Sequence, residues 1–148
     1  MRSLGLVAVL LLASACGAQP PAEEGEAPMT LADVAGATWQ LQSMTRGGTT
    51  TDIPKEVAIT FRVEPNGRVS GRSAVNRYFL TMTMADDGTL ALESGGAIGS
   101  TRMAGPPEHM ALETQYLAAL AAVTRAAKTD KTLTLTGTDT ELVFAPES

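Results

Sequence analysis

The chain has 148 residues, a length typical of a single domain, and carries 11 basic against 16 acidic side chains, for a net charge of −5. The basic residues are scattered along the sequence, and aromatic residues make up only 4% of it. Nucleic acid is bound through clustered lysines and arginines and through aromatic stacking surfaces. This composition therefore excludes nucleic acid as the expected partner.

The first sixteen residues have the three parts of a secretory signal. Arg2 supplies the positive charge, residues 4–13 form an apolar run, and small residues precede Cys16. A bilayer-spanning helix takes about 20 apolar residues, so this run is too short to be one. We expect residues 1–15 to be a signal peptide that is removed on export.

The end of this segment, Ala13-Ser14-Ala15-Cys16, resembles the lipobox of bacterial lipoproteins. The resemblance implies that Cys16 is lipidated, becomes the mature N-terminus and anchors the protein to a membrane. Gly17 after the cysteine favours the outer membrane, facing the periplasm, over the inner membrane. The alternative is a signal peptide that is cut elsewhere, with Cys16 unmodified.

Residues 16–30 are expected to be a disordered tether. After the cysteine this segment contains three prolines and three glutamates and shows no apolar periodicity. Proline stiffens a chain and like charges extend it, so at about 3.1 Å per residue the segment could reach roughly 40 Å. The domain itself is expected over residues 31–148. The alternative is an arm that packs on the domain.

Beyond the tether, apolar residues recur at every second position. Val57, Ile59, Phe61 and Val63 alternate with other residues, as in a half-buried strand, and Asn66-Gly67 then gives a strong hairpin signal. Other segments with strand or turn patterns are residues 39–41, 68–73, 80–85, 86–88, 90–92, 133–135, 137–139 and 142–144. The short spacing and tight turns favour antiparallel pairing.

Residues 107–125 follow a helical period instead. The residues on one face of this helix are Leu112, Tyr116, Ala119, Leu120 and Val123. Pro107 suits a first helical turn, Glu108 the positive end of the helix dipole, and Arg125 the negative end. The expected fold class is mainly β (α+β). About eight short antiparallel strands form a curved sheet or partly open barrel, with one amphipathic α-helix packed on it.

Two segments carry a resemblance to a known family: VSGRSAVNRY at residues 69–78 and STRMAGPPEHM at residues 100–110. They resemble the motifs of META/HslJ-like domains (DUF306-type bacterial envelope lipoproteins). The first family motif is a glycine, a short gap, then Gly-Cys-Asn-Arg and an aromatic residue; the second is Thr-Arg-Met-Ala-Cys before a helix with a glutamate. The matching residues include Gly71, Asn76, Arg77, Tyr78, Thr101, Arg102, Met103, Ala104, Glu113 and Leu120.

Val75 and Gly105 stand where the family motifs have cysteines. The resemblance implies that those cysteines pair in the family, which predicts that Val75 and Gly105 lie close in space. It also implies an envelope or secreted protein linked to stress tolerance and to resistance to some antimicrobials. The resemblance indicates no specific molecular activity.

Asn76, Arg77 and Arg102 have two interpretations. They could form a surface patch for a partner or an anionic ligand. In the favoured, structural interpretation, Asn76 caps a turn through its side chain and one of the two arginines pairs with Glu113 on the helix. The sequence does not say which arginine does so.

No metal, cofactor or catalytic group is expected. The methionines and histidine that could suggest a copper site are Met82, Met84, Met103, Met110 and His109. The favoured interpretation is that Met82 and Met84 fill gaps on an inward strand face. The chain has one histidine and no nucleophile-elbow or zinc-ligand motif, which favours a non-enzyme.

We expect a monomeric, non-catalytic, lipid-anchored envelope protein that supports envelope integrity or stress tolerance by binding an unidentified envelope partner. The first alternative is a carrier of a small apolar ligand inside a β-barrel, which requires an interior cavity of roughly 300 Å³ or more. The second is a hydrolase, which requires a cleft holding a nucleophile and a base.

Overall fold

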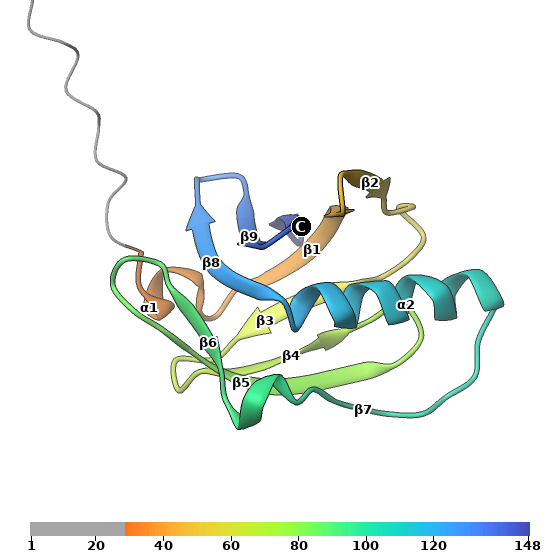
Figure 1. Ribbon diagram of the computed structural model, residues 1–148, viewed down its shortest axis with the longest axis horizontal. Coiled ribbons are helices and arrows are strands. Elements are labelled where there is room, and N and C mark those ends of the chain that lie inside the picture. Colours follow the sequence, from red (N-terminus) through yellow and green to blue (C-terminus); the bar gives the residue numbers. More distant parts are fainter. Residues whose placement is uncertain (1–28) are drawn as a thin grey trace, which may run out of the picture.

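A computed structural model describes residues 29–148 (Figure 1). The expected signal peptide, Cys16 and the tether up to residue 28 lie outside the described residues. The elements in chain order are α1 (Leu31–Val34), β1 (Thr38–Arg46), β2 (Thr49–Asp52), β3 (Thr60–Val63), β4 (Arg68–Arg72), β5 (Arg77–Met84), β6 (Leu90–Leu92), a 3-10 turn (Ser94–Gly96), β7 (Gly99–Ser100), α2 (Pro107–Leu120), β8 (Val123–Lys128), β9 (Leu133–Gly137) and β10 (Thr140–Pro146).

Eight strands form one continuous antiparallel path in the order β6-β5-β4-β3-β1-β10-β9-β8. Two shorter strands lie off this path, because β2 pairs with β1 and β7 pairs with β5. The predicted fold class is confirmed: the sheet curves into a nearly closed barrel with one main helix. Within residues 29–148, no helix has the length and apolar character needed to cross a membrane.

The two ends of the path, β6 and β8, meet at a short seam. Thr89 and Arg125 form an isolated antiparallel bridge, and the Ala126 amide donates to the Gly88 carbonyl at 2.9 Å. The Arg125 guanidinium also donates to the Asp87 carbonyl at 3.2 Å. Only these few bonds close the barrel, whereas β1 and β10 pair over most of their length.

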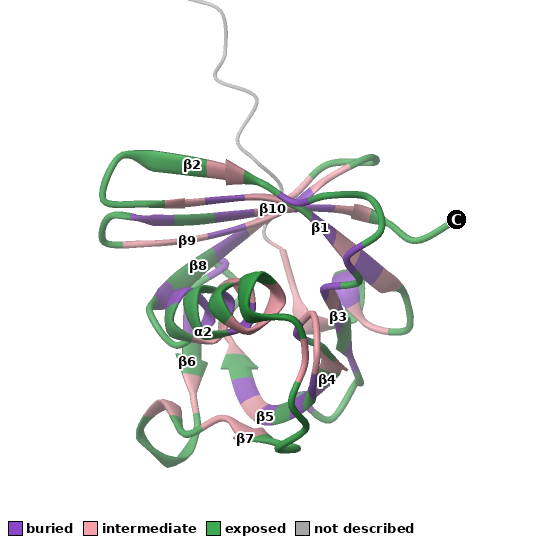
Figure 2. Ribbon diagram, turned by 90° about the vertical axis from the view of Figure 1, so that its right-hand side faces the viewer, coloured by how far each residue is buried: buried purple, intermediate pink, exposed green. Residues whose placement is uncertain are grey.

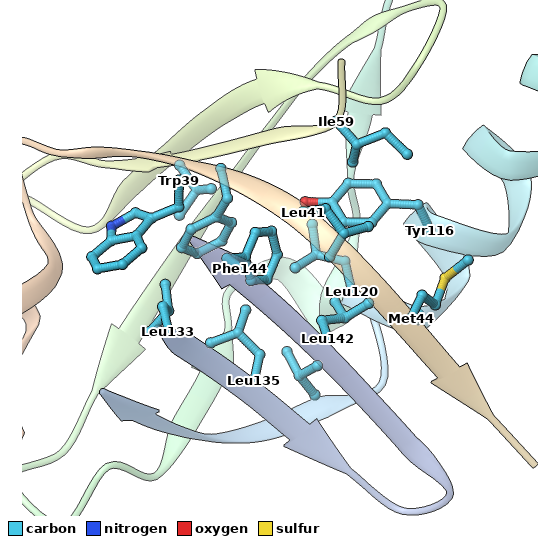
Figure 3. Packing of buried hydrophobic residues seen from close by; sticks show 14 of the residues in the cluster. Trp39, Leu41, Met44, Ile59, Tyr116, Leu120, Leu133, Leu135, Leu142 and Phe144 are labelled. Atoms are coloured by element: carbon cyan, nitrogen blue, oxygen red, sulfur yellow. The ribbon is translucent and has the colours of Figure 1, made fainter. Parts of the chain in front are cut away.

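Helix α2 lies against the concave side of the sheet, with β1, β9 and β10 on one side and β4 and β5 on the other (Figure 2). Its buried residues are Glu113, Tyr116, Ala119 and Leu120. Inward side chains of the strands complete the core, and Figure 3 shows Trp39, Leu41 and Phe144 packed together. Phe61 and Phe144 form a tilted ring pair with centroids 5.4 Å apart.

The helix predicted over residues 107–125 is too long at its C-terminal end. The observed helix α2 ends at Leu120, and Val123 and Arg125 belong to β8 instead. Val123 pairs with Gly137 of β9. Gly137 has no side chain, and a Cβ there would collide with the Ala122 carbonyl. The chain therefore pairs as a strand with β9 from Val123 onward and does not continue as a helix. The predicted Pro107 and Glu108 in the first turn are confirmed.

The four-residue helix α1 was not expected from the sequence. The Asp33 carboxylate accepts hydrogen bonds from the Thr30 amide at 2.7 Å and the Thr30 hydroxyl at 2.8 Å, which fixes the first turn. These bonds hold the pKa of Asp33 below its ordinary value. Met29 and Leu31 pack against the core. Met29 and Thr30, which were expected to belong to the tether, are thus part of the described structure.

We predict that Gly88→Ala opens the β6–β8 seam. Gly88 has φ +79°, and a Cβ there would be 2.6 Å from the Ala126 carbonyl oxygen. Hydrogen exchange at the Ala126 amide should accelerate, because the carbonyl of residue 88 that accepts it must shift.

The matched control for this prediction is Gly48→Ala. Gly48 has the same φ of +79° with nothing within 4 Å of an added Cβ. It therefore carries only the backbone cost, roughly 1–2 kcal/mol, of placing a side chain in the left-handed region. Equal exchange rates at Ala126 in the two variants would contradict a role for Gly88 in the seam.

Candidate functional site

A buried polar cluster joins α2 to the turn between β4 and β5. Ser73 and Asn76 come from the turn and Glu113 from the helix, and all three are buried in an otherwise apolar interior. Buried polar groups are costly unless they are hydrogen-bonded, so their partners determine what this cluster does.

Both carboxylate oxygens of Glu113 accept short hydrogen bonds. Oε1 accepts from the Asn76 side-chain amide at 2.7 Å. Oε2 accepts from the Asn76 backbone amide at 2.7 Å and from the Ser73 hydroxyl at 2.8 Å. The helix is thus attached to the turn at three points through one side chain.

Asn76 in turn connects this turn to the segment before α2. Its amide nitrogen also donates to the Met103 carbonyl at 3.1 Å. Its side-chain oxygen accepts from the Met103 amide at 2.6 Å and from the Thr101 hydroxyl at 2.9 Å. Every donor and acceptor of the Asn76 side chain is therefore used, so this amide has only one possible orientation.

The turn itself depends on a residue in the left-handed region. Ala74 has φ +78°, where an alanine is strained, and it stands where the first family motif has a glycine. The Ser73 amide donates to the Asn76 carbonyl at 2.8 Å and closes the turn. This reversal directs Ser73 and Asn76 toward the same carboxylate.

The hydrogen bonds determine the charge state of Glu113. Burial alone would raise the pKa of this carboxyl, but the hydrogen bonds from Asn76, Ser73 and the backbone outweigh it and leave the pKa below its usual 4.5. Glu113 is therefore ionised at neutral pH, with both oxygens occupied. Ser73 is fully buried, so no substrate can reach its hydroxyl. The cluster therefore holds α2 against the turn between β4 and β5.

A pair of buried tyrosines lies beside this cluster. The Tyr78 and Tyr116 hydroxyls are 2.7 Å apart, and Tyr78 also donates to the Thr60 carbonyl at 2.8 Å. Burial raises the pKa of both phenols. Gly71 makes room for the Thr60 carbonyl and the Tyr78 ring, because a Cβ at position 71 would collide with that carbonyl and lie 2.8 Å from the ring. These two contacts account for the glycine of the first motif.

The predicted arginine partner of Glu113 is wrong. The carboxylate partners are Asn76 and Ser73, while Arg77 and Arg102 are exposed. The predicted capping of a turn by the Asn76 side chain is wrong as well, because that side chain bonds to Glu113, Thr101 and Met103, and the turn is closed by the Asn76 backbone carbonyl. Ser73 was missed as a member of the cluster, and Tyr116 as the partner of Tyr78, since neither differs in the sequence from an ordinary serine or core tyrosine.

Two of the hollows lie near the buried cluster, one against β3, β4 and β5 and the other against α2 and the segment before it. One, of about 410 Å³, is lined by Arg62, Arg72, Arg77 and Phe79 among others. The second, of about 340 Å³, is lined in part by Arg102, Met103 and Met110 and borders the buried cluster. Arg62, Arg72 and Phe79 were not selected from the sequence, although the alternation that turns Tyr78 and Leu80 inward turns Phe79 outward.

The comparisons with known proteins identify the chain. The family model described as META domain matches residues 32–148. The chain belongs to the META domain family. No curated protein matches it significantly.

Solved structures share the fold of this META domain. The NMR structure of a protein from Burkholderia xenovorans is 23% identical, with a TM-score of 0.65, and covers 88% of this chain and 98% of that one. A DUF4847 family protein from Bacteroides vulgatus is 13% identical, with a TM-score of 0.52, and covers 76% of this chain and 93% of that one. At these identities the likeness concerns the fold alone.

The two positions that replace cysteines in the META motifs are in contact. A Cβ at Gly105 would lie 2.7 Å from Val75 Cγ2 and 3.4 Å from Val75 Cβ. The predicted proximity is therefore confirmed. The valine side chain packs over the glycine backbone and occupies the space between the two segments.

The methionines are divided between the inside and the outside of the META domain. Met82 is buried in the core, whereas Met103 is 65% exposed. Among residues 29–148, no three histidine, cysteine, aspartate or glutamate side chains gather as a metal site would require.

We predict that Glu113→Gln lowers the free energy of unfolding by about 1–3 kcal/mol, because an NH₂ group must then face donors that the carboxylate accepts. A folded-state pKa below 4.5 means that Glu113 stabilises the fold above that pH and loses the effect as pH falls through the folded value. Melting temperatures measured against pH should therefore depend less on pH below about 4.5 in this variant. Glu108→Gln is the control, since it removes one exposed charge from the same helix; an equal effect there would refute the prediction.

We predict that the double variant Val75→Cys and Gly105→Cys, made with Cys16→Ser, forms a disulfide. The 3.4 Å between the two Cβ positions is close to the 3.5–4.5 Å that disulfides need. Closing a loop of about 30 residues should add about 3–4 kcal/mol, or roughly 10 °C in melting temperature. Thermal melts with and without dithiothreitol provide the measurement, and identical melts would exclude the bond.

Proposed function

We propose that this META domain protein is a non-catalytic interaction module held at the bacterial envelope by a lipid on Cys16. The signal-like residues 1–15 and the lipobox-like Ala13-Ser14-Ala15-Cys16 support the anchor. Gly17 supports the outer membrane, facing the periplasm. A role in envelope integrity or stress tolerance follows from the family resemblance.

The observation that carries this proposal is that, within residues 29–148, large buried side chains occupy the inside of the barrel, while the hollow of about 410 Å³ lies on the outer face of β3–β5. Four inward aromatic side chains are fully buried and form two ring pairs, Phe61 with Phe144 and Tyr78 with Tyr116. Figure 3 shows Tyr116 and Phe144 among the packed core residues. A carrier would keep that space for its ligand. Recognition at the outer surface is therefore favoured over transport of a small apolar molecule.

A hydrolase is disfavoured by the hydrogen bonding of Glu113. Glu113 is ionised, but both of its oxygens are occupied by hydrogen bonds within the protein. A general base has to reach the proton that it abstracts. The hydrogen bonds of Glu113 instead fix the position of α2.

We predict that the wild-type protein stays with membranes washed in high salt, which screens charge contacts, and that Cys16→Ser releases it to the soluble fraction under the same wash. Mass spectrometry of the N-terminal peptide should show acyl chains on Cys16 in the wild type, because burial of several acyl chains holds a protein firmly on a bilayer. A soluble wild-type protein without acyl chains would refute the anchor.

The carrier alternative has its own measurement. Native mass spectrometry of the purified mature chain should show the protein mass alone. A co-purifying apolar molecule that disappears in a variant with a larger side chain inside the barrel, such as Ala119→Leu, would favour the carrier. Arg72→Gln is the control, since it lies on the outer surface.

A further inference from the structure

The outer face of β3, β4 and β5 gathers arginines that are distant in sequence. Arg62, Arg72 and Arg77 all occupy outward positions of these strands and line the hollow of about 410 Å³. Arg68 lies on the same face of β4 and lines a neighbouring hollow with Glu93. Four of the eleven basic residues of an acidic chain thus share one surface, which the scattered sequence pattern did not predict.

Two of these arginines are direct cross-strand neighbours. Arg72 of β4 pairs with Arg77 of β5 in the antiparallel register, and both are exposed. Like charges in directly opposite positions destabilise a sheet. The residues that line their hollow include a third arginine and no acidic side chain. An anion bound between the guanidinium groups would relieve this repulsion.

An exposed phenyl ring stands within the arginines. Phe79 is 59% exposed and lines both the hollow of Arg72 and Arg77 and the hollow of Arg68. The Phe79 ring packs on Gly99 of the paired strand β7, so closely that a Cβ at position 99 would collide with it. This contact fixes the position of the ring. One face of the ring is thus supported by the sheet, while much of the rest is open to the surroundings.

We propose that this face docks on the surface of an anionic phospholipid leaflet, with lipid phosphates on the arginines and Phe79 at the level of the headgroups. Guanidinium groups bind phosphate oxygens through paired hydrogen bonds, and phenylalanine beside basic residues is found on protein surfaces that lie in the membrane interface. The proposal rests on the function proposed above, since an anchor at Cys16 would keep the domain within reach of such a surface.

An acidic protein or a nucleic acid fits this face less well. Phosphate or carboxylate recognition alone needs no exposed phenyl ring beside the arginines. Stacking of single-stranded nucleic acid needs several aromatic platforms, and Phe79 is the only large aromatic side chain that is exposed among residues 29–148. Basic residues combined with an aromatic ring are typical of proteins that lie on anionic membranes.

The test uses the mature chain, residues 16–148, carrying Cys16→Ser. The probes are vesicles of phosphatidylglycerol mixed with phosphatidylcholine, compared with pure phosphatidylcholine vesicles in flotation. We expect binding to the anionic vesicles only, decreasing as salt is added. Arg72→Gln with Arg77→Gln should weaken it roughly 30-fold, and Phe79→Ser roughly tenfold.

The matched control is Arg46→Gln with Lys55→Gln, which removes the same charge from exposed positions outside β3–β5. This control should retain binding within about twofold, because charges away from the contact are screened. Equal losses in the two double variants, or equal binding to neutral vesicles, would overturn the proposal. Thermal melts check that all variants are folded.

A second measurement locates the contact. Amide shifts during titration with a short-chain phosphatidylglycerol, kept below its micelle concentration, should cluster on β3–β5. Shifts of the same size with inorganic phosphate, or binding of polyglutamate that Phe79→Ser leaves unchanged, would overturn the lipid assignment in favour of a simple anion or an acidic protein. The samples carry Cys16→Ser and so have no acyl anchor. A negative result would therefore refute the docking face but not the anchor at Cys16, and evidence against the anchor would not affect the vesicle result.

Discussion

The Glu113 carboxylate accepts three short hydrogen bonds from Ser73 and Asn76, and the placement of α2 inside the curved sheet depends on them. A charge in an apolar interior is tolerated only when such donors surround it. The strained turn at Ala74 supplies the donors, and Asn76 extends the network to Thr101 and Met103. The two family motifs are therefore joined at Asn76, which also holds the helix through Glu113. Three of the residues that match the family, Asn76, Thr101 and Glu113, belong to this attachment of helix to sheet.

This attachment has a consequence for where the domain can bind other molecules. Helix α2 lies against the concave side of the sheet (Figure 2), and buried side chains of the helix and the strands, including the Tyr78–Tyr116 pair, occupy the interior. Hydrogen bonding of Thr101 to Arg77 connects the buried network directly to the outer face of β5. Side chains on that outer face are carried by a sheet whose inner side is tightly packed, so their spacing is well defined.

Much of the fold could be predicted from the sequence, because alternation of apolar residues reports which strand face is buried. The segments around Ile59, Leu80 and Leu133 are examples. The end of α2 could not, since pairing of Val123 with Gly137 is a tertiary contact that local periodicity does not contain. The prediction that an arginine pairs with Glu113 was wrong for a related reason. Charge alone suggested a cation, whereas the turn geometry supplied neutral donors. Likewise, the arginine face exists only after the strands have paired.

Because Val75 and Gly105 are in contact without a disulfide, folding of this domain does not depend on the redox potential around it. The only cysteine of the chain is Cys16, outside the described residues, so the domain contains no thiol to oxidise. Its native state should be equally accessible in a reducing cytoplasm and in an oxidising periplasm, without help from a thiol oxidase or a disulfide isomerase. Export of the chain, as proposed above, would then rely on keeping it unfolded until translocation, since redox potential gives no protection against early folding.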